Sequence, residues 1–166
     1  MKLKEMFVAA PIHPLTYMFG AALSVLVSSI PSISLLITIA ATTLPLTAAS
    51  LISLVLILLA TWLLSSCLGF VVAGYVNDPT RIGTIAPYTG AVLTTLPPVY
   101  YPLEAIPTQF WILALLPPTA HLSQLAKLVT GISMPTLNPL IYIASIILYL
   151  AAFTTLASFK SRWREK

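Results

Sequence analysis

The sequence PPVYYPLEAIPTQFWILALLPPTAHLSQLAKLVTG, residues 97–131, decides how the rest of the chain can be arranged. It is apolar enough to enter a membrane, but prolines interrupt it at positions 97, 98, 102, 107, 117 and 118. Each proline ring removes a backbone donor and clashes with the turn before it, so no continuous helix runs through the segment. Two short helices fit between the breaks, at 106–116 and 119–130, with Gly131 as the stop. Neither reaches the roughly 20 residues that cross hydrocarbon, so the sequence predicts a hairpin that enters a bilayer and turns back.

The composition indicates which solvent surrounds this hairpin. Hydrophobic residues make up 58% of the sequence and charged residues only 7%, against about 25% charged in an average soluble domain. A soluble core would need a polar surface that so few charged side chains cannot supply. The sequence therefore predicts an all-α, polytopic integral membrane protein that forms one transmembrane domain over residues 1–166.

The apolar runs predict four transmembrane helices. No Asp, Glu, Lys or Arg occurs from residue 6 to residue 77, which leaves room for two spans joined by a turn at Leu44-Pro45. The polar sequence Asn77-Asp78-Pro79 is a turn signal that opens a third span, and Thr80 is available as its N-cap. Prolines inside the spans predict a kink at Pro31 and a weak point at Pro87. The predicted spans are 17–41, 48–75, 82–101 and 137–159.

The two ends of the chain and its basic residues predict the orientation. Residues 1–14 form an amphipathic segment that is expected to lie on the membrane surface, and residues 160–166 form a basic tail. With both ends in the cytoplasm, four spans place seven of the eight basic residues inside and leave only Lys127 outside, as the positive-inside rule requires. The outer helical hairpin, 102–131, then lies between the third and fourth spans of a cell-membrane protein. The net charge of +4 follows from this topology and gives no reason to expect nucleic acid.

Several short motifs carry a resemblance to a known family. They are Tyr101-Pro102-Leu103, Ala105-Ile106-Pro107 and the break Leu115-Leu116-Pro117-Pro118-Thr119-Ala120, preceded near the N-terminus by Ala9-Ala10-Pro11 and Pro14-Leu15. In this order and spacing, the sequence resembles the C-terminal two thirds of a permease of the type-2 ATP-binding-cassette (ABC) export family. Such permeases have six spans, and the four predicted here lack counterparts of the first two. The chain is therefore expected to be a fragment, a split half that a second polypeptide completes, or a permease with a decayed start.

The resemblance implies a permease subunit of an ATP-driven exporter, forming part of the path for a hydrophobic or lipid-linked substrate or drug. The partners it implies are a cytoplasmic ATP-binding ABC subunit and a second permease copy or complementary half, within the lipid bilayer. No GxxxxGK[ST] sequence occurs in the chain, so ATP hydrolysis is expected in the partner and no cofactor is expected here. The residues expected to contact the ATPase subunit are Leu3, Lys4, Met6, Phe7, Ala10 and Pro11. Those expected to form the outer hairpin site are Tyr101, Pro102, Leu103, Glu104, Pro107, Pro117, Pro118, Thr119 and His121.

Few residues suggest other chemistry. His13 and His121 lie on opposite faces of the predicted topology and cannot share a metal ion. We expect His121 to satisfy hydrogen bonds within the hairpin, with a gating or proton-coupled role as the alternative. Cys67 is the only cysteine and is expected to be a small buried side chain. Glu104 and Lys127 either remain solvated or pair across the hairpin, where Glu104 suits a helix N-terminus.

Two further classes of function remain beside the permease. One is a non-transporting assembly or regulatory subunit, or a truncated inactive permease fragment. The other is a membrane-embedded enzyme, for which the sequence offers no catalytic constellation: it has no Gly-x-Ser-x-Gly or HExxH motif and no acidic pair inside a span.

Overall fold

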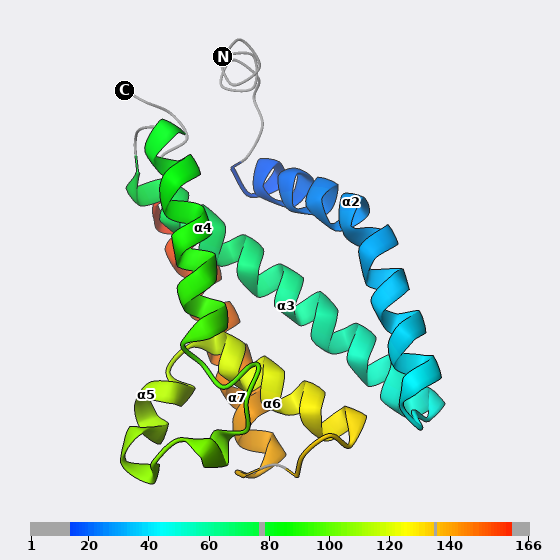
Figure 1. Cartoon of the computed structure of the whole chain (residues 1–166). Coiled ribbons are helices and arrows are strands. Elements are labelled where there is room, and N and C mark those ends of the chain that lie inside the picture. The colour runs from blue at the N-terminus through cyan, green and yellow to red at the C-terminus, as the bar shows by residue number, and fades with distance from the viewer. Residues whose placement is uncertain (1–13, 77–78, 135, 161–166) are drawn as a thin grey trace.

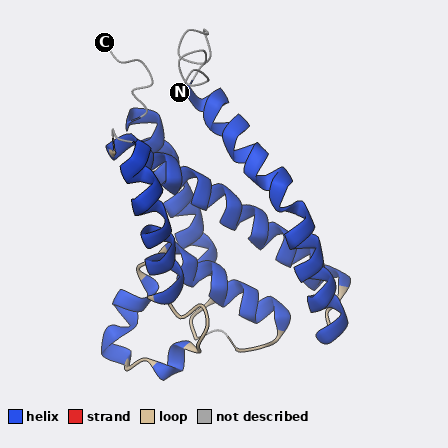
Figure 2. Cartoon of the chain, turned by 45° about the horizontal axis from the view of Figure 1, so that its top comes forward, coloured by secondary structure: helices blue, strands red, loops and turns tan. Residues whose placement is uncertain are grey.

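The computed structural model of the chain describes residues 14–76, 79–134 and 136–160. Over these residues the regular structure is helical throughout, as Figures 1 and 2 show, which confirms the all-α prediction. The helices are α2 (Pro14–Thr43), α3 (Ala48–Tyr75), α4 (Pro79–Thr95), α5 (Trp111–Leu115), α6 (Pro118–Thr130) and α7 (Pro139–Lys160), with 3₁₀ turns η1 (Leu103–Ala105) and η2 (Thr108–Phe110).

Three stretches of helix are long and apolar enough to cross a membrane: Phe19–Thr43, Ala48–Tyr75 and Pro139–Ala157. The shares of these stretches that are buried inside the chain are only 6%, 11% and 17%, respectively. Most of their apolar side chains therefore face the surroundings of the molecule. By length and composition, this is compatible with a multi-pass membrane protein.

Most hydroxyl groups of α2 bond to carbonyls within the same helix. In α2, for example, Ser29 donates to the Val25 carbonyl at 2.8 Å and Thr38 donates to the Ser34 carbonyl at 2.8 Å. A Ser or Thr that bonds to the carbonyl three or four residues earlier places no unpaired polar group on the helix surface. The many hydroxyls of α2 are thus consistent with its exposure to apolar surroundings.

The turn between α2 and α3 lies where the sequence predicts it. Helix α2 ends at Thr43 and α3 begins at Ala48. Thr47 caps α3, because its side chain accepts a 3.2 Å hydrogen bond from the backbone N–H of Ser50. Pro31 lies inside α2, and the ribbon in Figure 1 bends along that helix, as expected for an internal proline.

Helix α4 differs from the third predicted span. It has 17 residues, which is about 25 Å at the α-helical rise, less than the roughly 30 Å of hydrocarbon in a bilayer. It ends at Thr95 because Pro97 and Pro98 cannot continue it. Its start at Pro79 places Thr80 inside the first turn, so the prediction of Thr80 as N-cap is wrong. Pro87 is accommodated within the helix.

The core is formed where α3, α6 and α7 pack together. Its buried residues are Leu64 from α3, Leu122 and Leu125 from α6, and Tyr142 and Ile146 from α7. The long helices alternate in direction along the chain (Figure 1). In both views, the segment that contains η1, η2, α5 and α6 lies at the end of the molecule opposite to the start of α2 and the end of α7.

Candidate functional site

The segment 97–131, which we call the broken hairpin, is the candidate functional site. The helical stretches Thr108–Leu115 and Pro118–Thr130 meet at 105°. Pro117 is extended, with φ −70° and ψ 139°, and Pro118 occupies the first turn of α6. The second helix is one residue longer than predicted, and the first begins two residues later, with Pro107 as its N-cap. Gly131 ends α6 with φ 71°, a left-handed conformation that favours glycine.

The prolines leave some backbone carbonyls without a helical donor. For one of these carbonyls, a side chain of the hairpin donates the hydrogen bond instead. The Leu93 carbonyl in α4 would normally accept from the backbone N–H of residue 97, but that residue is proline. The Thr119 hydroxyl of α6 donates to it instead, at 2.5 Å. Thr119 therefore joins the start of α6 to the end of α4. These two helix ends lie close together in Figure 1.

A second set of contacts fixes the connection after α4. The ammonium group of Lys127 donates to the Pro98 carbonyl and to the Tyr101 carbonyl, both at 2.7 Å. The Ser123 hydroxyl lies 3.4 Å from the same Pro98 oxygen. The rings of Pro97 and Pro98 are fully buried. One face of α6 thus holds a stretch of backbone that has no regular structure of its own.

Helix α7 supplies a similar contact at the bend itself. The Tyr149 hydroxyl donates to the carbonyl of Leu116, directly before Pro117. This bond gives the carbonyl before the break a protein donor, although Leu116 itself is exposed. The broken hairpin is accordingly supported from α4 and α7 as well as from within.

Glu104 contacts the segment that precedes α7. It lies in η1, and its carboxylate accepts a 2.9 Å hydrogen bond from the Thr136 hydroxyl. A backbone hydrogen bond, the Thr136 hydroxyl and the positive charge of Lys127 lower the pKa of Glu104 below its usual value, despite slight desolvation. Leu103 beside it is buried, with 1% of its surface exposed. Glu104 is exposed, and its side-chain hydrogen bond comes from Thr136, outside the hairpin, rather than from Lys127.

His121 is buried on the inner face of α6, with 6% of its surface exposed. Its ring lies between two tyrosines of α7, with centroid distances of 5.8 Å to Tyr142 and 6.1 Å to Tyr149. The expectation that the hairpin satisfies its hydrogen bonds is not met at Nδ1, which has no protein partner. The amide nitrogen of Gln124, one helical turn later, has none either.

The aromatic residues of the hairpin divide into anchored and exposed rings. The Tyr101 hydroxyl donates to the Leu96 carbonyl at 2.8 Å, and the Trp111 indole donates to the Ile106 carbonyl at 2.9 Å. Tyr100 and Phe110 are exposed. Each anchored ring therefore places its polar atom on a backbone carbonyl near a proline.

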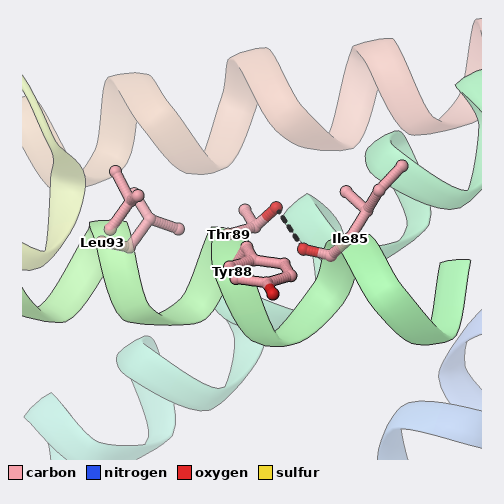
Figure 3. A pocket seen from close by; sticks show the side chains of 5 residues that line it. Ile85, Tyr88, Thr89 and Leu93 are labelled. Carbon is pink, nitrogen blue, oxygen red and sulfur yellow. Dashed lines mark hydrogen bonds between the residues drawn. The ribbon is translucent and has the colours of Figure 1, made fainter.

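A shallow groove runs along α4, and the sequence reasoning did not find it. Figure 3 shows Ile85, Tyr88, Thr89 and Leu93 on one side of the helix, with the Thr89 hydroxyl turned back to the Ile85 carbonyl at 3.0 Å. Together with Val92 these residues line an open, mostly apolar space of about 390 Å³. In the sequence, these residues recur three and four positions apart, and this spacing could have predicted that they share one face of a helix.

The remaining predicted residues are placed as follows. The residues expected to contact an ATPase subunit, Leu3 to Pro11, lie outside the described residues. Cys67 is buried in α3, and its sulfur lies 3.7 Å from the Thr154 hydroxyl of α7, which fits a small core side chain. Among the described residues, no group of three or more His, Cys, Asp or Glu side chains is arranged to hold a metal ion.

The predicted hairpin residues come from one continuous segment and gather at one end of the molecule. Thr119 and Tyr149 join this segment to α4 and α7, and Lys127 and Ser123 connect its own parts. In the sequence, such residues could have been found as a cation and hydroxyl groups in an otherwise apolar stretch. Comparison with models of protein families, with curated proteins and with solved structures found no match to this chain.

Proposed function

We propose that the chain is a multi-pass membrane protein, and that the broken hairpin is a re-entrant element at its outer face. The observation that supports this is the satisfaction of the proline breaks by Thr119, Lys127 and Tyr149. Irregular backbone at membrane depth is tolerated only where protein or a water-filled cavity covers it. In an aqueous loop, solvent could satisfy these carbonyls and such contacts would be unnecessary.

Within this architecture we place the chain as a permease subunit of an ATP-driven ABC exporter. The proposal rests on the hairpin motifs of the sequence and is supported by the alternation of long apolar helices around the α3, α6 and α7 core. A separate cytoplasmic subunit would bind and hydrolyse ATP. A second permease copy or a complementary half would complete the path.

The substrate class we propose is hydrophobic or lipid-linked. The open groove on α4 is consistent with this, because its lining is apolar apart from the hydroxyls of Tyr88 and Thr89. Transport of such a substrate needs no charged group along the path.

The test of the permease function is whether an ATPase depends on this chain. The chain would be purified from its native membrane, and the preparation assayed for a P-loop protein and for ATP hydrolysis. Replacing both Met6 and Phe7 with Asp should remove the ATPase subunit while the chain still inserts, since these residues form the apolar face of the amphipathic segment.

The matched control places the same two charges beside that face, in the variant Val8→Asp with Ala9→Asp. This variant should keep the ATPase subunit. If wild-type preparations contain no P-loop protein at stoichiometric amounts, the permease proposal is overturned, and a non-transporting assembly or regulatory subunit becomes the better description.

A further inference from the structure

The polar atoms of α6 that lack a protein partner lie together in the interior. His121 is 6% exposed and Gln124 is 3% exposed, and both sit on the helix that forms the core with α3 and α7. His121 Nδ1 and Gln124 Nε2 are the buried side-chain nitrogen and oxygen atoms without a hydrogen bond among the described residues. Buried polar groups are nearly always paired, so two such atoms in one place call for a ligand.

The two residues are neighbours on the helix surface. Residues three apart in an α-helix have Cβ atoms about 5–6 Å apart. A single oxygen that hydrogen-bonds to both side chains at about 2.8 Å fits between groups at this spacing. Neither neighbouring tyrosine hydroxyl bonds to these atoms: Tyr142 accepts from the Leu137 backbone N–H at 3.2 Å, and Tyr149 donates to the Leu116 carbonyl.

The hydrogen-bonding character of the two atoms defines the ligand. Nδ1 of His121 and the amide nitrogen of Gln124 are both buried and without a protein partner. Nδ1 of a neutral imidazole accepts a hydrogen bond or donates one, according to which ring nitrogen carries the proton, whereas the amide nitrogen of Gln124 is a donor. A hydroxyl group satisfies both residues in either case, because its oxygen accepts from the amide and the group can donate to Nδ1 or accept from it.

We propose that His121 and Gln124 form an internal binding site for one hydroxyl group, which bridges Nδ1 and the amide nitrogen between α6 and α7. A metal ion would bind Nδ1 but would face the hydrogens of the amide, and an ammonium group cannot accept a hydrogen bond. The hydroxyl belongs either to an enclosed water molecule or to the alcohol group of a bound amphiphile. Both present the same donor and acceptor to the site.

The experiment uses the full chain with ¹⁵N-labelled histidine and ¹³C-methyl-labelled leucine, in vesicles of phosphatidylcholine and phosphatidylglycerol, whose headgroup carries free hydroxyl groups. The substitution His13→Gln leaves His121 as the only imidazole, since the chain has two histidines. Solid-state NMR then measures magnetisation transfer to His121 Nδ1 from water protons and, separately, from lipid protons. We expect early transfer to Nδ1 from one source, several-fold faster than to the buried methyl groups of Leu125.

The source of the rapid transfer identifies the ligand. Transfer from water that disappears in D₂O assigns the hydroxyl to water, and transfer from lipid protons that persists assigns it to an amphiphile. Either outcome supports the site. The proposal would be overturned if the Nδ1 resonance were typical of a nitrogen without a hydrogen bond and no early transfer came from either source. This result needs no variant.

A pair of variants tests whether the site is shared. Gln124→Met keeps the length of the side chain but removes the donor, so the transfer to His121 should fall several-fold and the Nδ1 resonance should move. Gln109→Met makes the same change at an exposed residue of the same hairpin and should change neither. Unaltered Leu122 and Leu125 resonances show that the core persists. If Gln124→Met leaves His121 unchanged, the two residues do not share a ligand and the proposal is wrong.

Discussion

The ammonium nitrogen of Lys127 lies 2.7 Å from the carbonyl oxygen of Tyr101, 26 residues earlier in the chain. The same group contacts the Pro98 carbonyl at 2.7 Å. A single side chain on α6 therefore organises the irregular backbone between α4 and η1. In a segment where prolines exclude regular hydrogen bonding, long side chains replace the helix ladder.

Lys127→Met should lower the thermal stability of the chain. The substitution keeps the apolar stem but leaves two carbonyls without their charged donor. Hydrogen bonds to charged groups contribute about 1.5–3 kcal/mol each, and partial exposure reduces this, so we expect a loss of about 1–3 kcal/mol. For a chain of this size, each kcal/mol shifts Tm by about 2–4 °C. The measurement is the Tm of the purified protein in detergent.

Lys127→Arg is the matched control, because it retains the charge and the donors. It should recover a large part of the lost stability, with some loss from the different geometry of the guanidinium group. Equal Tm values for Lys127→Met and wild type would contradict the anchoring role.

The stability contributed by Glu104 should depend on pH in the acid range. Its backbone hydrogen bond, the Thr136 hydroxyl and Lys127 lower its pKa in the folded chain. A lowered pKa gives a contribution that is complete above the unfolded value of about 4.3 and is lost as pH falls through the folded value. Glu104→Gln should therefore flatten the decline of Tm with falling pH below about 4.3.

Thr136→Val removes the hydroxyl donor to Glu104 and should reduce the same pH dependence in part. Because Glu104 is exposed, the change in Tm is expected to be small and is best detected as a difference between pH series. A pH series for Glu104→Gln that overlays that of wild type would show that the carboxylate is simply solvated.

Some parts of the fold could be predicted from the sequence because single residues determine them. The turn at Pro45, the start of α6 to within one residue of the Pro117-Pro118 break, and its end at Gly131 follow from backbone chemistry that few neighbours can alter. The length of α4 was harder, since the apolar sequence continues to Tyr101 while the helix ends at Thr95. There, the missing N–H groups of Pro97 and Pro98 outweigh the hydropathy of the segment.

The contacts of the candidate site could be predicted less well. Thr119 was expected in the hairpin, but its partner Leu93 depends on how α6 crosses the end of α4. Lys127 was identified only as a charge in the topology, because its two carbonyl partners are created by the path of the connection. Tertiary pairing of this kind leaves no periodic signal in one sequence.

Thr119→Val should destabilise the junction of α6 and α4. Valine has nearly the shape of threonine but cannot donate, so the Leu93 carbonyl would be left without the bond that replaces the missing N–H of Pro97. Leaving a buried acceptor unpaired costs about 1–3 kcal/mol. Thr130→Val makes the same change in the same helix, where the hydroxyl bonds only to carbonyls of its own helix, and should have a smaller effect. Equal losses of Tm in the two variants would contradict the junction.

The proposed orientation predicts different access to the two ends of the molecule. Single cysteines at Gln109, which is exposed in the hairpin, and at Ser161, in the basic tail, would be compared in a Cys67→Ser background. An impermeant thiol reagent added to intact cells should label position 109 and leave position 161 unlabelled until the membrane is opened. The reverse pattern would place the hairpin in the cytoplasm.

The bend of 105° should persist when both Pro117 and Pro118 are replaced by alanine. Fusing the two helices would supply backbone donors for about two carbonyls, a gain of about 0.5–1.5 kcal/mol each. It would also withdraw Leu122 and Leu125 from the core and move His121 and Gln124 out of the interior. In the interior the proposed hydroxyl pairs with both groups, whereas in hydrocarbon nothing can, so exposing them there costs more than the two backbone bonds return.

Nitroxide labels at Gln109 and Ile132, both exposed, would report the angle as a distance in a Cys67→Ser background. The double alanine variant should give the wild-type distance with a lower Tm. Adding Leu122→Ala and Leu125→Ala removes much of the packing that opposes fusion, so the distance should then lengthen and its distribution broaden. If the double alanine variant alone gave the longer distance, the prolines rather than the packing of α6 would determine the bend, and the support from α3 and α7 would be secondary.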